Sequence, residues 1–554
     1  MWVMKVLTAA EMQACDRVTT ERFGIPSIEL MRAASRAVVT FARARFRRAR
    51  RVTVLCGRGN NGGDGLMAAR LLAEAGLDVT TILLGAPDAL KGDAAAAWNE
   101  LSAAPHGPIH IVTEPEQLTA LVPALATDLL IDAILGTGFT PPVRGLALAA
   151  IEWASNSTAP VLAVDLPSGW PSDSTAFQHD GPYLAADAVI TFTAPKPAHV
   201  FGQLTRSWRD PVAVAPIGSP AAAIASAQNL TWAGTSKAIV ETPRPADSNK
   251  GRFGHVMILG GAVGKAGAPA MAALAAMRSG AGLTTAAVPA PVLATVAGFA
   301  PELMTVPLPA TPAGELAEIV PERLADLLKG KTAAAVGPGL GQGGGARALI
   351  AALLESSSIP LVLDADALNL IAADAALLAL LSAQGRAGRT LVLTPHPGEM
   401  ARLAATTVAA IQADRLVAAR SFAQQNAVTL VLKGARTLVA HPNGRVAVNT
   451  SGNPALAKGG SGDMLTGWIA SLLAQHLAEP ARAVETAVYL HGLAADLAVR
   501  RADEHTLLAT DTLREFSRAF RFRSHGQNNY VFLQGAFRPD APFEAQHGKC
   551  RSSR

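Results

Sequence analysis

The sequence predicts an α/β protein of two doubly wound domains, each a parallel sheet between two layers of helices. The chain has 554 residues, and a single hydrophobic core rarely grows beyond about 250–300 residues. Half of the residues are apolar and 16% are charged, which excludes a disordered or fibrous chain. Short β-rich runs alternate with helical runs in two separate stretches, which is typical of parallel strands joined by crossover helices.

The first stretch predicts a domain over residues 1–220. A helical run over residues 66–75 separates the first two of its predicted strands. The predicted strands are Val52–Cys56, Val79–Leu84, Leu129–Ile134 and Val161–Leu166. Ligands of such sheets bind at the carboxyl ends of the strands, so polar residues that follow these runs are the candidates for a site.

The alternation restarts in residues 246–513 and predicts a second domain. Its predicted strands are His255–Gly260, Ala333–Gly337, Leu361–Asp364, Thr390–Thr394 and Thr429–Leu432. Residues 221–245, where Pro, Ala, Ser and Gly dominate, predict a linker. Residues 514–554 form a basic, aromatic tail without clear periodicity. A nucleic-acid tail and a poorly ordered extension both fit it, and it is assigned no role.

The charge distribution and the cysteine content bear on two questions: whether the protein binds nucleic acid or a membrane, and in which compartment it works. The net charge is +5, and the tail alone accounts for it with eight Lys or Arg against three Asp or Glu. The rest of the chain is neutral, so the basic balance does not indicate nucleic acid. The longest charge-free stretches are broken by prolines, which argues against a membrane partner. Three distant cysteines and no apolar leader predict a cytoplasmic protein.

A glycine-rich segment follows the strand that ends at Cys56. Residues 57–65 read Gly-Arg-Gly-Asn-Asn-Gly-Gly-Asp-Gly and lead into the helical run. Glycine and asparagine tolerate positive φ, and a helix N-terminus favours phosphate, so the segment predicts an anion cradle. A tight turn is the plainer alternative. The dinucleotide pattern is matched, but the acid expected at the end of the second strand is absent.

Two more strand ends carry polar residues. One reads Asp132-Ala-Ile-Leu and continues into residues 136–142, and the other reads Asp165-Leu-Pro-Ser168. Three loops therefore converge on one crevice, where oxygens of Asn61, Asp132 and Ser168 predict a hard-cation site. Each residue alone could be a cap or a turn.

Together these motifs resemble those of NAD(P)H-hydrate epimerases over residues 4–218. Such enzymes interconvert the R and S forms of NADHX and NADPHX, which are nicotinamides hydrated on the ring. The resemblance implies potassium at Asn61, Asp132 and Ser168. It also implies a Rossmann-like domain that binds the hydrate through Asn60, Asn61, Gly62, Gly63, Asp64, Gly136, Thr137, Gly138, Phe139, Thr140, Pro141, Pro142 and Asp165. Asp165 ends a central strand and is the candidate acid/base.

The informative segment of the second half is residues 453–464, Asn-Pro-Ala-Leu-Ala-Lys-Gly-Gly-Ser-Gly-Asp-Met, which precedes a helical run over 465–474. Glycine amides at a helix N-terminus stabilise a phosphoryl group in transfer. An Asp at the helix start stays ionised and can accept a proton from a hydroxyl. Asp463 is therefore a candidate catalytic base, with a capped surface helix as the alternative.

With residues 337–341, 394–399 and 433–437, this segment resembles the NAD(P)H-hydrate dehydratases, a ribokinase-like branch, over residues 249–513. The resemblance implies a ribokinase-like domain that phosphorylates the S hydrate from ADP and then releases phosphate. The implied hydrate-binding residues are Ala268, Gly339, His396 and Asp463. The implied ADP-binding residues are Lys433, Gly434, Ala435, Arg436, Thr437 and Gly462.

The two resemblances predict a bifunctional repair enzyme, both isomerase and lyase, that turns NADHX and NADPHX into NADH and NADPH at the expense of ADP. A ribokinase-like small-molecule kinase with a regulatory first domain is the alternative, and a non-catalytic nucleotide sensor in the first half is a third. Mg²⁺ is expected with the phosphates and K⁺ in the first domain. We also expect a homo-oligomer.

Overall fold

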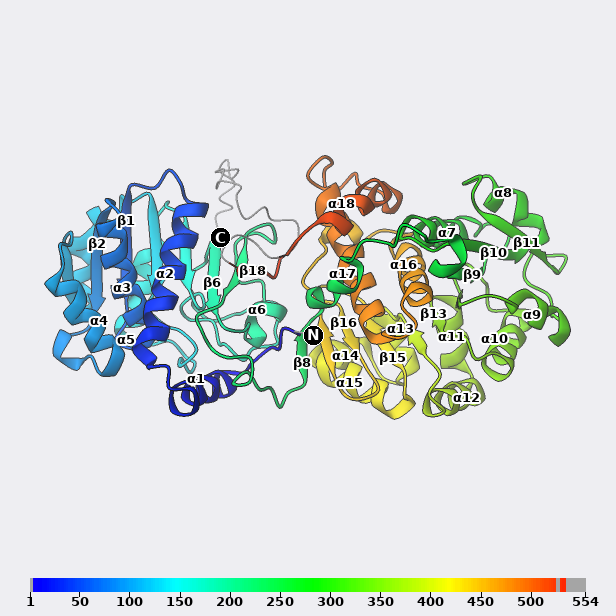
Figure 1. Cartoon of the computed structure of the whole chain (residues 1–554), viewed down its shortest axis with the longest axis horizontal. Helices are drawn as coiled ribbons and strands as arrows, with labels where there is room; N and C mark the ends of the chain where they lie inside the picture. The colour runs from blue at the N-terminus through cyan, green and yellow to red at the C-terminus, as the bar shows by residue number, and fades with distance from the viewer. Residues whose placement is uncertain (1–2, 525–528, 535–554) are drawn as a thin grey trace. The chain divides into compact units, whose positions relative to one another are not determined.

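The computed structural model describes residues 3–524 and 529–534 and divides into two compact units. The first unit comprises Lys5–Gln228 and the described residues after Phe522. The second comprises Asn229–Phe522 and the described residues before Lys5. Each unit is built on one sheet flanked by helices (Figure 1), which confirms the predicted α/β class.

The first unit contains an eight-stranded sheet in the order β18-β7-β6-β5-β4-β1-β2-β3. Neighbouring strands are parallel except for β18, which pairs antiparallel with β7. Its strands are β1 (Arg51–Cys56), β2 (Asp78–Leu84), β3 (Ile109–Val112), β4 (Leu129–Ala133), β5 (Val161–Val164), β6 (Ala188–Phe192), β7 (Val212–Ala215) and β18 (Val531–Phe532). The α-helices are α1 (Ala9–Phe23), α2 (Ser27–Arg45), α3 (Asn60–Glu74), α4 (Gly92–Ala103), α5 (Gly145–Ala154) and α6 (Pro197–Phe201).

The second unit contains a ten-stranded sheet in the order β11-β10-β9-β12-β13-β14-β15-β16-β17-β8. It is parallel except where β16 pairs antiparallel with β15 and β17. The strands are β8 (Leu230–Trp232), β9 (His255–Leu259), β10 (Leu283–Pro289), β11 (Met304–Leu308), β12 (Ala333–Val336), β13 (Leu361–Leu363), β14 (Leu391–Leu393), β15 (Thr429–Leu432), β16 (Leu438–Ala440) and β17 (Val446–Val448).

The helices of this unit alternate with the parallel strands. They are α7 (Gly267–Arg278), α8 (Leu293–Ala297), α9 (Pro321–Leu328), α10 (Gly344–Ser356), α11 (Asp366–Ala373), α12 (Ala375–Arg386), α13 (Pro397–Leu403), α14 (Val408–Ala413), α15 (Arg415–Asn426), α16 (Ser461–Gln475), α17 (Pro480–Ala498) and α18 (Phe516–Arg521). Helices α7 and α16 pack on each other and on β9, so the helix that follows the residue 453–464 motif belongs to the core.

The boundary between the units differs from the expected linker. Of residues 221–245, those from 229 onward belong to the second unit, where β8 pairs parallel with β17 and Trp232 is 1% exposed. A three-residue strand is too short to show a period, and burial of the indole holds it at the sheet edge.

The start of the expected tail is also part of the fold. Helix α18 packs on α17, and β18 extends the sheet of the first unit. Tyr530 and Phe532 are buried, so these aromatic residues pack in a core. Residues 525–528 and 535–554, which include Cys550, lie outside the described residues.

Among the described residues, no single helix has both the length and the apolar composition to cross a bilayer. The pair α11 and α12 meets those two criteria jointly and is bent by 107°.

Candidate functional sites

The glycine-rich segment of the first unit joins β1 to α3 by close backbone packing. A Cβ atom on Gly57 would lie 2.0 Å from the Ile134 carbonyl oxygen, and one on Gly62 would lie 1.8 Å from the Gly57 oxygen. Helix α3 begins at Asn60, earlier than the helical run predicted from 66. The expected cradle residues 60–64 therefore form the first turn of the helix, where free backbone N–H groups favour an anion.

Asp165 lies directly after β5 in a left-handed backbone conformation with φ of 64°. Its Oδ1 accepts hydrogen bonds from Lys196 Nζ at 2.8 Å and from Thr191 Oγ1 at 2.8 Å. Burial alone would raise the pKa of Asp165, but the charge of Lys196 and the hydrogen bonds from Lys196 and Thr191 outweigh it, and the pKa lies below its ordinary value. Asp165 is therefore an ionised, buried carboxylate.

Lys196 is fixed by its neighbours. Its backbone N–H donates to His199 Nδ1 at 2.9 Å, and His199 Nε2 lies 2.7 Å from the Asp165 carbonyl oxygen. Burial lowers the pKa of His199 to about 4, so the imidazole is neutral and donates to that carbonyl through Nε2. The His199 ring thus hydrogen-bonds to the main chain of both Asp165 and Lys196.

The same charges affect the pKa values of two further carboxyl groups. Burial raises the pKa of Asp64, and the negative charges of Asp165 and Asp16 add to that shift. Burial also raises the pKa of Asp16 to about 6, against the pull of Lys196. The site therefore combines one ionised carboxylate, one ammonium group and two carboxyl groups whose pKa values are raised.

Of the three candidate potassium ligands, Asp132 and Ser168 contact each other, whereas Asn61 makes no side-chain hydrogen bond among the described residues. Both side-chain polar atoms of Asn61 are buried without a hydrogen-bond partner among the described residues. The Asp132 carboxylate instead accepts from Ser168 Oγ at 2.5 Å and from Ser168 N at 2.8 Å. Burial raises the pKa of Asp132 to about 6. Asn61 thus offers an unsatisfied oxygen, whereas the other two residues satisfy each other.

The loop after β4 reaches Asp165 through its first residues. Thr137 N donates to Asp165 Oδ2 at 3.2 Å, and a Cβ atom on Gly136 would lie 3.1 Å from Cγ of Asn61 and 3.3 Å from that carboxylate oxygen. Of the other expected hydrate contacts in this loop, Phe139 is half-buried, and the rest are exposed: Gly138, Thr140, Pro141 and Pro142.

In the second unit, the motif of residues 453–464 forms the start of α16. Gly460 caps the helix with φ of 93°, and a Cβ atom there would lie 2.6 Å from Met271 Sδ. The helix begins at Ser461, ahead of the predicted run, and Asp463 lies in its first turn. Burial, and next the charge of Asp364, raise the pKa of Asp463 to about 7 against the pull of Lys433. Asp463 can therefore take up and release a proton near neutrality.

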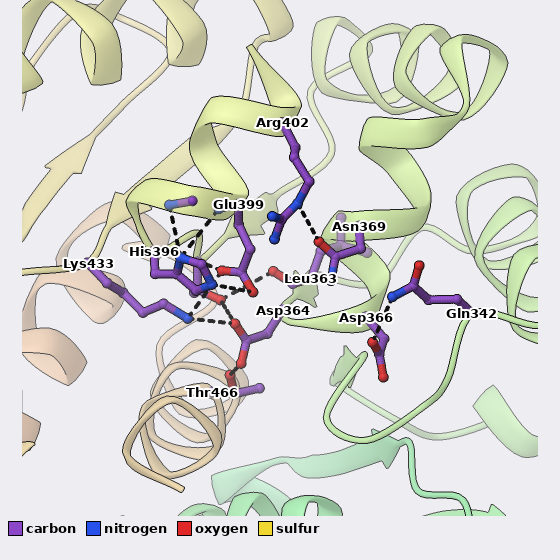
Figure 2. Close-up of polar contacts among 12 residues, drawn as sticks. Gln342, Leu363, Asp364, Asp366, Asn369, His396, Glu399, Arg402, Lys433 and Thr466 are labelled. Carbon is purple, nitrogen blue, oxygen red and sulfur yellow. Dashed lines mark hydrogen bonds and ion pairs between the residues drawn. The ribbon is translucent and has the colours of Figure 1, made fainter. Parts of the chain in front are cut away.

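A buried carboxylate, Asp364, lies at the centre of this site (Figure 2). It is 2% exposed. Its Oδ1 accepts from Thr394 Oγ1 at 2.7 Å and from Lys433 Nζ at 3.0 Å, and its Oδ2 accepts from Thr466 Oγ1 at 2.7 Å. A Cβ atom on Gly462 would lie 3.5 Å from Lys433 Nζ. Asp364 therefore connects three strand ends to the first turns of α16.

His396 begins α13 and caps it. Its Nδ1 accepts from Gly398 N at 3.0 Å, and its backbone N–H donates to Glu399 Oε2 at 2.8 Å. Burial lowers the pKa of His396, and half of its side chain is exposed. The accepting Nδ1 leaves Nε2 as the protonated nitrogen, 3.5 Å from Glu399 Oε1.

Two further expected hydrate contacts, Gly339 and Ala268, lie close to each other. Gly339 has φ of 64°, and a Cβ atom on it would lie 2.7 Å from the Lys265 carbonyl oxygen and 3.3 Å from Ala268 Cβ. Lys265 in turn pairs with Asp366 at 3.4 Å.

The expected ADP segment, residues 433–437, forms the turn between β15 and β16. Arg415 holds this turn, because its guanidinium donates to the carbonyl oxygen of Ala435 at 2.5 Å and to that of Lys433 at 3.3 Å. Thr437 Oγ1 donates to Gly434 O at 2.9 Å, and Arg436 Nη1 donates to Thr450 O at 3.1 Å.

Several residues at these sites were not identified from the sequence. They are Lys196, Thr191, His199 and Asp16 in the first unit and Asp364, Thr466 and Arg415 in the second. Thr394 and Glu399 lie in the segment 394–399, which the sequence did single out, but neither was given a role. Asp364 and Lys196 follow strands of parallel sheets, so the rule that placed Asp165 could have found both.

Comparison with known proteins matches both halves of the chain. The family profile described as NAD(P)H-hydrate dehydratase matches residues 256–518, and that described as YjeF-related protein N-terminus matches residues 27–198. Among solved structures, the ADP/ATP-dependent NAD(P)H-hydrate dehydratase from Bacillus subtilis co-crystallised with ATP/Mg²⁺ is 32% identical, with a TM-score of 0.42, and covers 51% of this chain and 96% of its own.

Full-length relatives match as well. The bifunctional NAD(P)H-hydrate repair enzyme Nnr of Moorella thermoacetica is 40% identical over 516 residues, which cover 92% of this chain and 95% of that protein. The protein of the same name from Escherichia coli is 35% identical over 511 residues, with 91% of each chain covered. These matches do not favour the small-molecule kinase alternative. The chain belongs to the family of bifunctional NAD(P)H-hydrate repair enzymes.

Proposed function

We propose that the first unit epimerises the R and S forms of NADHX and NADPHX, and that the second dehydrates the S form with ADP. One observation carries the proposal: Asp463, a carboxyl that titrates near neutrality, lies in the first turn of α16 next to Gly462 and the Lys433–Asp364 pair. A base, helix-start N–H groups and an ammonium group thus meet at one point, as phosphoryl transfer to a hydroxyl requires.

In the dehydratase step, Asp463 accepts the proton of the ring hydroxyl while that oxygen attacks the β-phosphorus of ADP, and AMP leaves. Lys433 and the N–H groups at the start of α16 stabilise the charge on the transferred group. The carbon–oxygen bond then breaks, phosphate leaves with its electron pair, and the ring nitrogen supplies electrons. Loss of a proton from the neighbouring carbon restores the dihydropyridine ring.

For this step, Gly462 with the residue 433–437 turn binds ADP, and Ala268, Gly339 and His396 contact the hydrate. The proposal is supported by the position of Gly462 beside Lys433 and by the contact between Gly339 and Ala268. His396 presents a protonated Nε2 as a hydrogen-bond donor.

In the epimerase step, the hydrate's phosphates lie at the start of α3 over residues 60–64, and residues 136–142 line the rest of the ligand. Asp165 and Lys196 are the acid/base groups at the hydrated carbon: Lys196 protonates the hydroxyl, which leaves as water while the ring nitrogen supplies electrons, and Asp165 accepts a proton from the water that adds to the other face. The proposal is supported by the 2.8 Å contact between Lys196 Nζ and Asp165 Oδ1, across which the proton can return to Lys196.

Two ions belong to the proposal. Asn61, Asp132 and Ser168 would hold K⁺, a choice that the unsatisfied, buried amide of Asn61 supports. Such an ion would supply positive charge for the substrate's phosphates. Mg²⁺ is proposed to arrive with ADP and to neutralise its phosphates. No cluster of three His, Cys, Asp or Glu residues able to hold a metal is found in the described part of the chain. Cytoplasmic location and self-association stay predictions.

The test is to incubate the full-length protein with mixed R and S NADHX and to follow the absorbance of the reduced nicotinamide with ADP, with ATP and with neither. Nearly complete recovery of NADH with ADP is expected, because epimerisation feeds the R form to the dehydratase. Recovery of the S fraction alone would contradict the epimerase assignment. No recovery with either nucleotide would contradict the dehydratase assignment.

A further inference from the structure

The Asp364 carboxylate faces the helix start where Asp463 lies, because a Cβ atom on Gly462 there would be 3.9 Å from Asp364 Oδ2. Its two oxygens accept from hydroxyls that follow β14 and lie on α16, and from the Lys433 ammonium that follows β15. Glu399 Oε2 lies 3.8 Å from the same ammonium group. Lys433 is therefore held from two sides, with its nitrogen near Gly462.

We propose that Asp364 is a positioning residue for phosphoryl transfer: it holds Lys433 at the start of α16 and supplies the negative charge that makes Asp463 an effective base. This inference rests on the proposed dehydratase function. A carboxylate at a helix start is normally a weak base, because the helix end and nearby cations favour its ionised form. The adjacent negative charge of Asp364 opposes both effects and strengthens the affinity of Asp463 for a proton.

The charges around Asp463 and Lys433 come from four neighbouring elements. Asp364 follows β13 and Lys433 follows β15, while Glu399 and His396 lie on and before α13. His491 of α17 also senses Lys433, and burial lowers its pKa to about 4, so it is neutral. The negative charge of Asp364 thus raises the pKa of Asp463, and the positive charge of Lys433 lowers it.

The test compares Asp364→Asn with the full-length parent in the pH dependence of NADH formation from S-NADHX and ADP. Loss of the negative charge is expected to move the acidic limb of the rate profile about one pH unit lower and to reduce the plateau rate at least tenfold, because Asp463 becomes a weaker base and Lys433 loses its anchor. Thr466→Val is the matched control: it removes one hydrogen bond to Asp364, keeps the charge and is expected to leave the acidic limb in place.

A measurement without turnover separates this inference from the proposed function. Calorimetry of ADP binding in two buffers of different ionisation enthalpy reports the net proton uptake, and the difference between the parent and Asp463→Asn gives the share of Asp463. The pH at which that share is largest is expected to fall in the Asp364→Asn background, even if the parent forms no NADH. If Asp364→Asn does not fold, Asp364→Ser removes the same charge in a smaller side chain. An unmoved acidic limb and unmoved proton uptake in a folded, charge-neutral variant would overturn the proposal.

Discussion

Lys196 and Asp165 form a buried ion pair in the first unit, with Nζ 2.8 Å from Oδ1 and the two side chains 3% and 10% exposed. Removing two charges from water is costly, and such a pair gives little net stability compared with apolar packing. Its presence beside the loop after β4 is better explained by chemistry, because Lys196 holds the pKa of the buried Asp165 below its ordinary value.

Replacing Lys196 with Met is therefore expected to lower R-to-S conversion at least a hundredfold while the second unit still dehydrates S-NADHX. The reason is twofold: the acid is lost, and burial of an unpaired Asp165 raises its pKa. The measurement is NADH yield from pure R-NADHX with ADP. Asp165→Asn serves as the comparison and should give the same loss. Normal conversion by a folded Lys196→Met protein would remove the residue from the mechanism.

The dehydratase rate is expected to fall on the acidic side of pH 7. The pKa of Asp463 is raised to about 7, and a carboxylate base works only when ionised, so protonation removes activity as the pH drops through that value. Below it, the rate should decline about tenfold per pH unit. Initial rates of NADH formation from S-NADHX at saturating ADP test this, and a rate that stays constant down to about pH 5 would contradict the assigned base.

Two glycines of the glycine-rich segment, Gly62 and Gly59, are expected to respond differently to substitution by alanine. A Cβ on Gly62 would lie 1.8 Å from the Gly57 oxygen, whereas one on Gly59 meets nothing within 4 Å. Gly62→Ala should abolish epimerase activity and cost about 1–3 kcal/mol of unfolding free energy. Gly59→Ala, at the helix N-cap, should cost less than about 1 kcal/mol and keep activity. Denaturant unfolding with R-NADHX turnover measures both, and equal effects would contradict the packing argument.

Local motifs supplied most of the candidate residues of the two sites, and the structure adds contacts between residues that follow different strands. The segment after β1 and the segment that leads into α16 each hold their candidate residues within about a dozen positions. Asn61 and Asp463 could therefore be named as candidates from spacing. Asp364 accepts hydrogen bonds from Lys433 and Thr466, which are 69 and 102 residues away in the sequence, and no single-sequence pattern records such contacts. The helix starts were predicted late because glycines and asparagine at the first turn resemble a loop.

The second domain was predicted to start at residue 246, yet β8 lies before that boundary, and this difference has a measurable consequence. Trp232 is 1% exposed, its Nε1 donates to Thr450 Oγ1 at 2.8 Å, and its ring meets Tyr489 edge-on at 5.7 Å. Trp232→Ala would leave a cavity at the edge of the second sheet and remove the hydrogen bond from the indole to Thr450. It is expected to cost about 3–5 kcal/mol of unfolding free energy.

The control for Trp232 is Val320→Ala in the same unit, because that side chain is 60% exposed and its loss should change stability by less than about 0.5 kcal/mol. Denaturant unfolding of the full-length protein, followed through loss of dehydratase activity, compares the two variants. If both variants lose dehydratase activity at the same denaturant concentration as the parent, residues 229–245 are a linker, as the sequence predicted. If Trp232→Ala alone unfolds early, those residues are part of the dehydratase fold, and a chain cut at residue 246 would lack an edge strand.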